Sequence, residues 1–227
     1  MVALLVVGTF IVALLIDALV RRARKGKIEP ARVYAAVAER RMPGFPAGYF
    51  FTPGHVWVNL RASGRVQLGI DELIGRLIGK ADRIEMKKAG DKIHKGELLA
   101  KVIQGDKTIR ILSPIDGTIE QCNYELEDHP EEFAENPYTK GWFYSISPAN
   151  LSADLRNFAV ADQTKSWWSQ EINRLREFVQ TRLPQPAMAG LTYQDGGLPL
   201  DGLVAHFDSK AVEEFETEFL GYKGNKE

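Results

Sequence analysis

Histidine and cysteine, the usual ligands of a protein metal site, are present in this sequence but not at ligating spacings. The four histidines are His55, His94, His129 and His206, and no two of them are four residues apart. Spacings of i, i+4 or Cys-x-x-Cys bring ligands together on one helix face or turn. Because Cys122 is the single cysteine, a cysteine-rich zinc site and an internal disulfide are both excluded. We expect each histidine to be a surface or hydrogen-bonding residue, and we predict no metal.

Motifs for nucleophilic catalysis and phosphate binding are also missing. The sequence has no Gly-x-Ser-x-Gly elbow and no Gly-x-x-x-x-Gly-Lys-Ser/Thr loop. Asp195 and Asp201 lie in a turn-rich stretch without the Asp-x-Asp-x-Asp-Gly pattern of a calcium loop, which favours turn formation. A denser group of carboxylates surrounds a predicted helix start and is typical of a solvated cap: Glu125, Glu127, Asp128, Glu131 and Glu132. We predict no independent catalytic activity.

The composition is that of a globular protein with balanced charge. The 227 residues are 44% hydrophobic and 26% charged, which is enough for one core with extensions. Basic and acidic residues number 29 and 30, so the formal net charge is −1. No field of one sign would attract nucleic acid, and the single Cys122 fits a reducing compartment.

The N-terminal residues form the most apolar segment of the chain. Residues 2–20 read VALLVVGTFIVALLIDALV, broken only by Asp17 and followed directly by RRARKGK. A helix of this length just crosses a hydrocarbon core, and the basic residues after it indicate a cytoplasmic C-terminal side. A signal peptide would carry its positive charge before the apolar run, and a core helix is rarely so long and unbroken. We predict a transmembrane anchor over 1–21, with the N-terminus outside.

The segment after the anchor connects it to a β-rich domain. Residues 22–48 contain the basic flank, an Ala-rich connector helix and the linker PGFPAG. Short runs typical of strands follow between 49 and 148. Two helical inserts are expected within them, at 71–78 and 127–135. The strand-like runs are HVWVNL, RVQLGI, RIEM, ELLAKVI, TIRIL, GTIEQC and WFYSI.

Seven short motifs in this region resemble the glycine cleavage system H protein family. Each motif is weak alone, but their order and gaps match over about 100 residues. They are Phe51-Thr52-Pro53 with His55-x-Trp57-Val58, Leu68-Gly69-Ile70-Asp71, Ala89-Gly90-Asp91-Lys92, Lys95-Gly96-Glu97, Ser113-Pro114-x-x-Gly117, Leu126-Glu127-x-x-Pro130 and Asn136-Pro137-Tyr138-x-x-Gly141-Trp142.

The resemblance implies a mainly β, lipoyl-type barrel-sandwich hybrid with small helices over residues 49–158. It also implies two facing antiparallel sheets related by a pseudo-twofold, and a tight hairpin that presents a lipoate-bearing lysine. For the whole chain we add the transmembrane helix and a helical or irregular C-terminal extension to this fold class.

The residue at the family's lipoyl-lysine position is an aspartate in this chain. Counting ten residues on from Gly96, or eight back from Pro114, leads to Asp106. The nearest amine, Lys107, comes one residue later. Because side chains alternate faces along a strand, a shift of one residue changes the direction of the amine. Ile103 also stands where the resemblance implies an acidic residue.

Two interpretations of Gln104-Gly105-Asp106-Lys107 remain open. The one we prefer is an unmodified two-residue hairpin turn, with Gly105 and Asp106 at the tip and no cofactor. The alternative is a lipoyl carrier in which Lys107 is lipoylated and a bulge absorbs the shift in register. Such a carrier would shuttle intermediates as in the glycine cleavage system.

We therefore predict a non-catalytic, membrane-anchored, H-protein-like module that serves as a scaffold or accessory subunit. Its partners would be membrane lipid through residues 2–20 and the subunits of a membrane-associated complex on the cytoplasmic side. Nucleic acid is not expected as a partner. Lipoate on Lys107 belongs to the alternative.

The C-terminal part of the chain is predicted to be helical at both ends. In 159–183, Trp168, Ile172, Leu175 and Val179 lie on one apolar face, which we expect to pack on the barrel. The alternative is that Trp167 and Trp168 anchor a partner or the membrane interface.

The last residues, 184–227, are predicted to form a turn-rich tail with a short docking helix at its end. That helix would cover about 209–220, with acidic residues on its outer face. Its apolar face comprises Val212, Phe215, Phe219 and Leu220.

Overall fold

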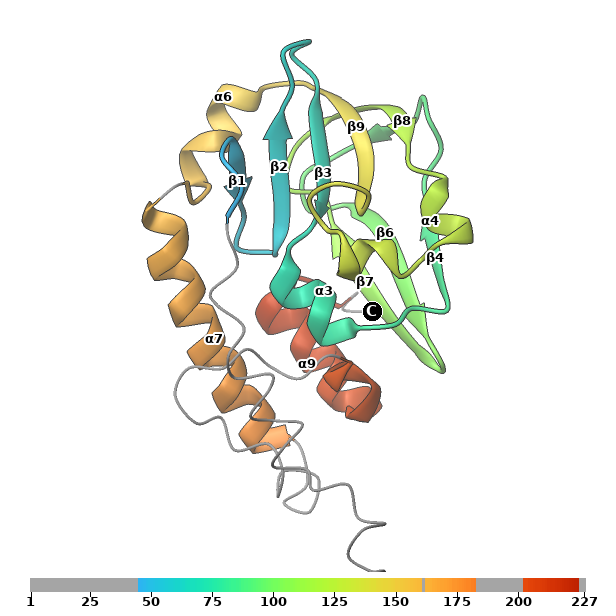
Figure 1. Cartoon of the computed structure of the whole chain (residues 1–227), viewed down its shortest axis with the longest axis vertical. Coiled ribbons are helices and arrows are strands. Elements are labelled where there is room, and N and C mark those ends of the chain that lie inside the picture. Colours follow the sequence, from blue (N-terminus) through green and yellow to red (C-terminus); the bar gives the residue numbers. More distant parts are fainter. Residues whose placement is uncertain (1–44, 161, 183–201, 225–227) are drawn as a thin grey trace, which may run out of the picture.

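Two antiparallel sheets form the centre of the molecule (Figure 1). This computed structural model describes residues 45–160, 162–182 and 202–224. The larger sheet has six strands in the order β1-β2-β3-β9-β8-β5, and the smaller has three in the order β4-β6-β7. The mainly β, lipoyl-type barrel-sandwich with small helices is thereby confirmed.

The larger sheet is built from short strands rich in β-branched residues, as strand propensity favours. β1 and β5 were not predicted, because three and two residues are too few to show a period of two. The strands of this sheet are β1 (Tyr49–Phe51), β2 (Val56–Leu60), β3 (Val66–Ile70), β5 (Lys92–Ile93), β8 (Gly117–Cys122) and β9 (Trp142–Pro148).

The smaller sheet consists of a long hairpin with one further strand. β6 (Leu98–Gln104) and β7 (Lys107–Leu112) form the hairpin, and β4 (Arg83–Met86) pairs with the other edge of β6. Along β7, Ile109 and Ile111 are buried, so this face of the hairpin closes the core. β6 is central, and β7 is an edge strand of the sheet.

Three short helices interrupt the strands. α3 (Glu72–Ile78) begins at Asp71, whose carboxylate accepts a hydrogen bond from the Ile74 N–H, as an N-cap aspartate does. The single helix predicted over 127–135 is wrong, because two helices occur, α4 (Glu125–Asp128) and α5 (Glu132–Glu135). Pro130 lies between them, and a proline disfavours helical geometry in the residue before it.

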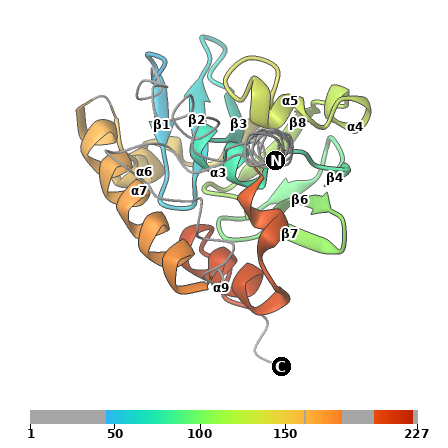
Figure 2. The same cartoon turned by 60° about the horizontal axis from the view of Figure 1, so that its bottom comes forward.

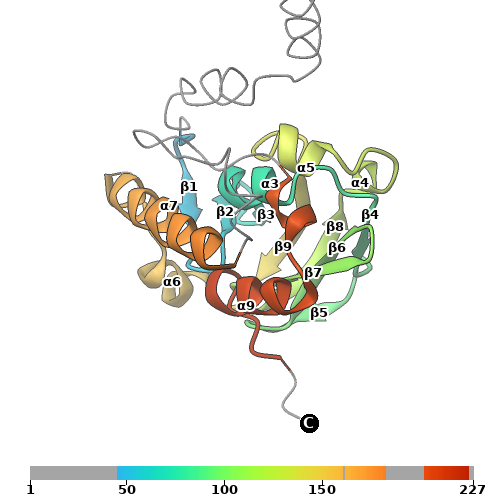
Figure 3. The ribbon, with the colours of Figure 1, turned by 90° about the horizontal axis from the view of Figure 1, so that it is seen from below.

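The C-terminal elements pack along one flank of the sheets. Figures 2 and 3 show α7 and α9 side by side there, with α9 beside β7. On α7 the predicted apolar face is buried, with Trp168, Leu175 and Val179 fully enclosed. The elements are α6 (Leu151–Asp154), η1 (Leu155–Asn157), α7 (Asp162–Arg182), η2 (Leu203–His206) and α9 (Ser209–Phe219).

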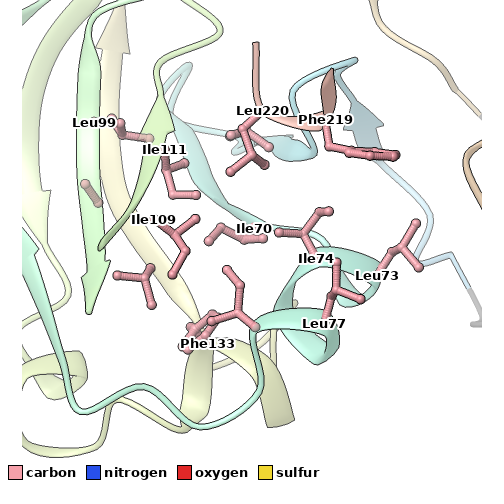
Figure 4. Close-up of a cluster of buried hydrophobic side chains, with 14 of the residues drawn as sticks. Ile70, Leu73, Ile74, Leu77, Leu99, Ile109, Ile111, Phe133, Phe219 and Leu220 are labelled. Atoms are coloured by element: carbon pink, nitrogen blue, oxygen red, sulfur yellow. The ribbon is translucent and has the colours of Figure 1, made fainter. Parts of the chain in front are cut away.

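A continuous core joins the strands, α3 and α9. In Figure 4, Ile74 from α3, Ile109 from β7 and Leu220 at the end of α9 lie around Ile70. All four side chains are buried. α9 is therefore part of the hydrophobic core.

Several predictions fall on residues outside those that the structure describes. The anchor over 1–21, most of the 22–48 connector and much of the 184–227 tail are among them. Within the described ranges, no helix is both long enough and apolar enough to cross a bilayer. The anchor and the domain boundaries stay predictions.

Candidate functional site

The β6–β7 hairpin ends in a two-residue turn. Gln104 and Lys107 form the last cross-strand pair, which leaves Gly105 and Asp106 as the central residues. Gly105 has φ +59°, and among the described residues the one non-glycine with positive φ is His55. A positive φ followed by a negative one fits a type II′ turn, which matches the twist of an antiparallel hairpin. The tip therefore has the conformation expected from its turn residues.

At this tip the exposed side chain is the aspartate, not the lysine. The Asp106 side chain is 86% exposed and that of Lys107 is 17% exposed. Lys107 lies on the same strand face as the buried Ile109, as alternation requires. Its Nζ atom is 3.1 Å from the Asp106 Oδ1 atom. The hydrogen bond from the Lys107 amine lowers the pKa of Asp106, so the tip carries an ion pair.

The free edge of β7 is covered by α9. The Arg110 N–H donates to the Glu216 Oε1 atom at 2.6 Å, and its Nη1 atom lies 2.8 Å from Oε2. The Arg110 guanidinium also lies 4.9 Å from the centre of the Tyr222 ring. An edge-strand donor that would otherwise face solvent or a partner strand is thus paired within the chain.

The prediction that the acidic residues of this helix face outward is wrong for Glu216. Its side chain is fully buried, and burial raises its pKa against the opposing effect of Arg110. Glu216 is four residues after Val212 and three before Phe219, so helical periodicity places it on the apolar face. That spacing was the signal that sequence reasoning missed.

A second cluster of buried polar groups surrounds His55, where the domain meets α7. The His55 Nδ1 atom is 2.7 Å from Asp71 Oδ2, and its Nε2 atom is 3.6 Å from Glu171 Oε2. The Trp167 ring lies over the imidazole at 5.1 Å between centroids. Burial lowers the pKa of His55, but the two carboxylates outweigh this effect and raise the pKa to about 9. His55 is therefore a cation that joins α3 and α7.

The other predicted polar residues lie apart from one another. His94 and His129 are exposed on separate loops, His206 is exposed at the end of η2, and Cys122 donates to the Lys87 carbonyl. Over the part of the chain that the structure describes, no three His, Cys, Asp or Glu side chains are close enough to bind a metal ion. The structure brings none of these groups into a shared site.

The two tryptophans that were candidate anchors point into the molecule. Trp168 is fully buried, and its ring packs edge-on against Phe45 at 5.1 Å. Trp167 is partly buried, with its ring over His55. Trp168 has no surface left for a partner in this conformation.

A surface pocket of about 1080 Å³ lies between α3 and the segment that follows α5. Its lining mixes acidic and basic side chains, among them Glu72, Lys80, Glu131 and Glu135. The mixture favours no single ligand charge.

The motifs that carried the family resemblance form contacts with one another. A Cβ on Gly69 would lie 2.4 Å from the Trp57 ring, so glycine is required for the indole to pack there. The Trp57 and Tyr138 rings lie 6.3 Å apart between centroids, and the Asn136 carbonyl accepts a hydrogen bond from the Gly141 N–H. These motif residues therefore maintain the fold, while the hairpin tip differs from the family pattern.

The two antiparallel sheets, with the β6–β7 hairpin of the smaller one, place this domain in the class of lipoyl-type barrel-sandwich folds. The sequence profile of the family described as Glycine cleavage H-protein matches residues 49–171. This chain belongs to the glycine cleavage H-protein family.

Relatives align over the same part of the chain. The Glycine cleavage system H protein of Chromobacterium violaceum is 35% identical over 120 residues, which cover 53% of this chain and 93% of that protein. The Probable glycine cleavage system H protein of Pyrococcus abyssi is 29% identical over 116 residues, 51% of this chain and 86% of that protein. Among solved structures, an H protein from Mycobacterium marinum aligns with 24% identity and a TM-score of 0.43, over 46% of this chain and 87% of that one.

Proposed function

We propose that this protein is a non-catalytic carrier of the H-protein type, with Lys107 as the residue that bears a lipoyl group. Support comes from the family match over residues 49–171 and from relatives named for the glycine cleavage system. The resemblance in sequence implies lipoate for that family. These findings favour the carrier over the membrane scaffold that we preferred from sequence, for which the described residues offer no support.

The observation that carries this proposal is the place of Lys107 at the end of the hairpin. A lipoyl group is attached through an amide, so the chain must supply a primary amine near the tip, and Lys107 is the residue that closes the turn. Its contact with the 86% exposed Asp106 is a surface ion pair, which water screens. The long, flexible lysine side chain can leave this contact by rotation about its own bonds.

The chain's own residues would hold and orient the arm. When bound, the lipoyl group would supply the dithiolane chemistry. The β6–β7 strands would carry the amine, and Asp106 would hold its positive charge until it is acylated. The protein would act as a substrate and docking partner for the enzymes of a multi-protein system.

A second candidate is an unmodified docking module. The observation that favours it is the apex itself, where the exposed side chain is Asp106. The module would recognise other subunits by its rigid surface. Tethering through residues 2–20, with the folded part on the cytoplasmic side, is a proposal from sequence alone and applies to either candidate.

The test is the intact mass of the full chain purified from its native host. A lipoyl adduct is expected on wild type and should be absent from Lys107→Arg. Lys101→Arg is the matched control, because Lys101 lies on the same hairpin with an exposed amine, and its adduct should be unchanged. A wild-type chain without any adduct would reject the carrier and leave the docking module.

The docking module has its own test. A chain without an adduct that co-purifies with a larger assembly after mild detergent extraction would support it. A lone monomer under the same conditions would argue against it.

A further inference from the structure

The tip of the hairpin is held from the side by the loop between α3 and β4. The side-chain amide of Gln104 donates one hydrogen bond to the Ile78 carbonyl at 2.7 Å and one to the Lys80 carbonyl at 3.0 Å. Both N–H donors of this amide are thus used on the backbone of a neighbouring loop. Gln104 therefore fastens the first residue of the turn.

The same loop also binds the central residue of the turn. The Gly105 N–H donates to the Asp82 Oδ2 atom at 2.6 Å, and the Asp82 N–H donates to the Ile103 carbonyl at 2.8 Å. Hydrogen bonds to a carboxylate are shorter and stronger than those between neutral groups. Asp82 thus binds the backbone of both neighbours of Gln104, Ile103 and Gly105.

These contacts restrict a part of the hairpin that would otherwise be mobile. Strand ends with exposed backbone hydrogen bonds open at low free energy, and beyond the Gln104–Lys107 pair this hairpin has only its turn. Because the Gly105 N–H is bound, the peptide plane before Gly105 cannot rotate freely. The directions of Asp106 and Lys107 follow from that plane.

The restraint is tied to the core through α3. The loop begins at the last residue of α3, and Leu77 and Ile78 are fully buried. The tip is consequently fixed to a packed helix as well as to its own sheet.

We infer that Asp82 and Gln104 are positioning residues that hold the hairpin tip in the one geometry read by the enzyme that acylates Lys107. This inference rests on the proposed carrier function. In the reaction the Lys107 amine attacks the carboxyl carbon of an adenylate-activated lipoate. The lysine ammonium first gives one proton to water; the C–N amide bond then forms as the bond between carboxyl carbon and phosphate oxygen breaks, AMP leaves with that electron pair, and the nitrogen gives a second proton to water, which leaves one N–H on the amide. Small errors in the position of a reacting group lower such a rate.

The experiment compares matched variants of the full chain. Gln104→Glu keeps the size of the side chain and removes both N–H donors, and Asp82→Ala removes the acceptor. Asp91→Ala is the control, because Asp91 accepts from the Lys88 N–H at 3.0 Å outside the hairpin. Two quantities are measured: hydrogen exchange of the Gly105 amide by NMR, and the acylation rate with a lipoate ligase, lipoate and ATP, followed by mass spectrometry.

We expect the Gly105 amide to exchange about tenfold faster in Asp82→Ala, a factor that corresponds to about 1.4 kcal/mol for the lost hydrogen bond to a carboxylate. Acylation should be about tenfold slower in Asp82→Ala and Gln104→Glu. Both quantities should be unchanged in Asp91→Ala. Asp82→Asn retains an acceptor oxygen and should recover most of the acylation rate.

The remaining outcomes separate this inference from the carrier function. Unchanged Gly105 exchange in both tip variants would overturn the restraint. Faster exchange with an unaltered acylation rate would show that the contacts are structural only and would overturn the positioning role. If wild type is not acylated at all while exchange still depends on Asp82, the restraint stands and the carrier function fails.

Discussion

The Nδ1 atom of His55 lies 2.7 Å from the Oδ2 atom of Asp71, with both side chains fully buried. Asp71 uses its other oxygen to cap α3, so a single carboxylate links the turn before β2 to that helix. Glu171 approaches the far side of the ring at 3.6 Å. His55 therefore connects the N-cap of α3, through Asp71, to α7, through Glu171.

Because His55 is charged in the folded chain, the free energy of unfolding should decrease at alkaline pH. Its pKa is about 9 in the folded chain against 6.5 as the ordinary value. The stabilisation is complete below pH 6.5 and is lost as the pH rises through 9, and a shift of this size corresponds to about 3 kcal/mol. The free energy of unfolding, measured with urea, should decrease as the pH is raised from 6.5 to 9.

The matched variants for this prediction are His55→Asn and His94→Asn. Asparagine tolerates the positive φ of residue 55, so His55→Asn should lose the pH dependence without added backbone strain. His94 is exposed and 3.2 Å from Asp116, and its variant should behave as wild type. An equal slope in His55→Asn would exclude this residue as the titrating group.

Glu216 is expected to be needed as an acceptor more than as a charge. Glu216→Gln keeps an oxygen for the Arg110 N–H and removes a carboxylate whose pKa burial raises, so it should cost less than about 1 kcal/mol. Glu216→Ala leaves that donor unpaired beside a cavity and should cost about 2–3 kcal/mol. Chemical denaturation would measure both, and equal costs would contradict this account.

Gly69 should not accept a side chain. A Cβ there would lie 2.4 Å from the Trp57 ring, and overpacking of this kind costs about 1–3 kcal/mol. We expect Gly69→Ala to lower the midpoint of urea unfolding. Gly224→Ala, where nothing lies within 4 Å, is the control and should leave the midpoint unchanged.

Trp168 should act on stability rather than on membrane or partner binding. It is fully buried, so Trp168→Ala should cost about 3–5 kcal/mol of unfolding free energy. Gln170→Ala alters an exposed position of the same helix and should be neutral. A Trp168→Ala chain that keeps its stability and loses affinity for lipid vesicles would revive the anchor interpretation.

Much of the fold could be predicted from the sequence, because local patterns are enough to specify strands and helices. Short strand-like runs predicted β2, β3, β4 and β6 to β9, and acidic residues at a helix start predicted α3. The Gly105-Asp106 turn followed from the φ freedom of glycine. β1, β5 and the break at Pro130 were missed, because elements of two to four residues are too short to carry a period.

The candidate site was only partly predictable. Sequence counting located Asp106 at the apex and Lys107 one place later, since covalent spacing is independent of packing. By contrast, the low exposure of the Lys107 side chain, against the high exposure of that of Asp106, depends on the folded structure.

By itself, the sequence determined the family, the hairpin and the identity of its tip residues, because these depend on local order along the chain. Only the tertiary structure decided that Glu216 covers the edge of β7, that His55 lies between two carboxylates, and that Asp82 and Gln104 hold the tip. Each of these contacts joins residues between 16 and 116 positions apart. Such pairs are set by the packing of whole elements, about which local sequence carries no information.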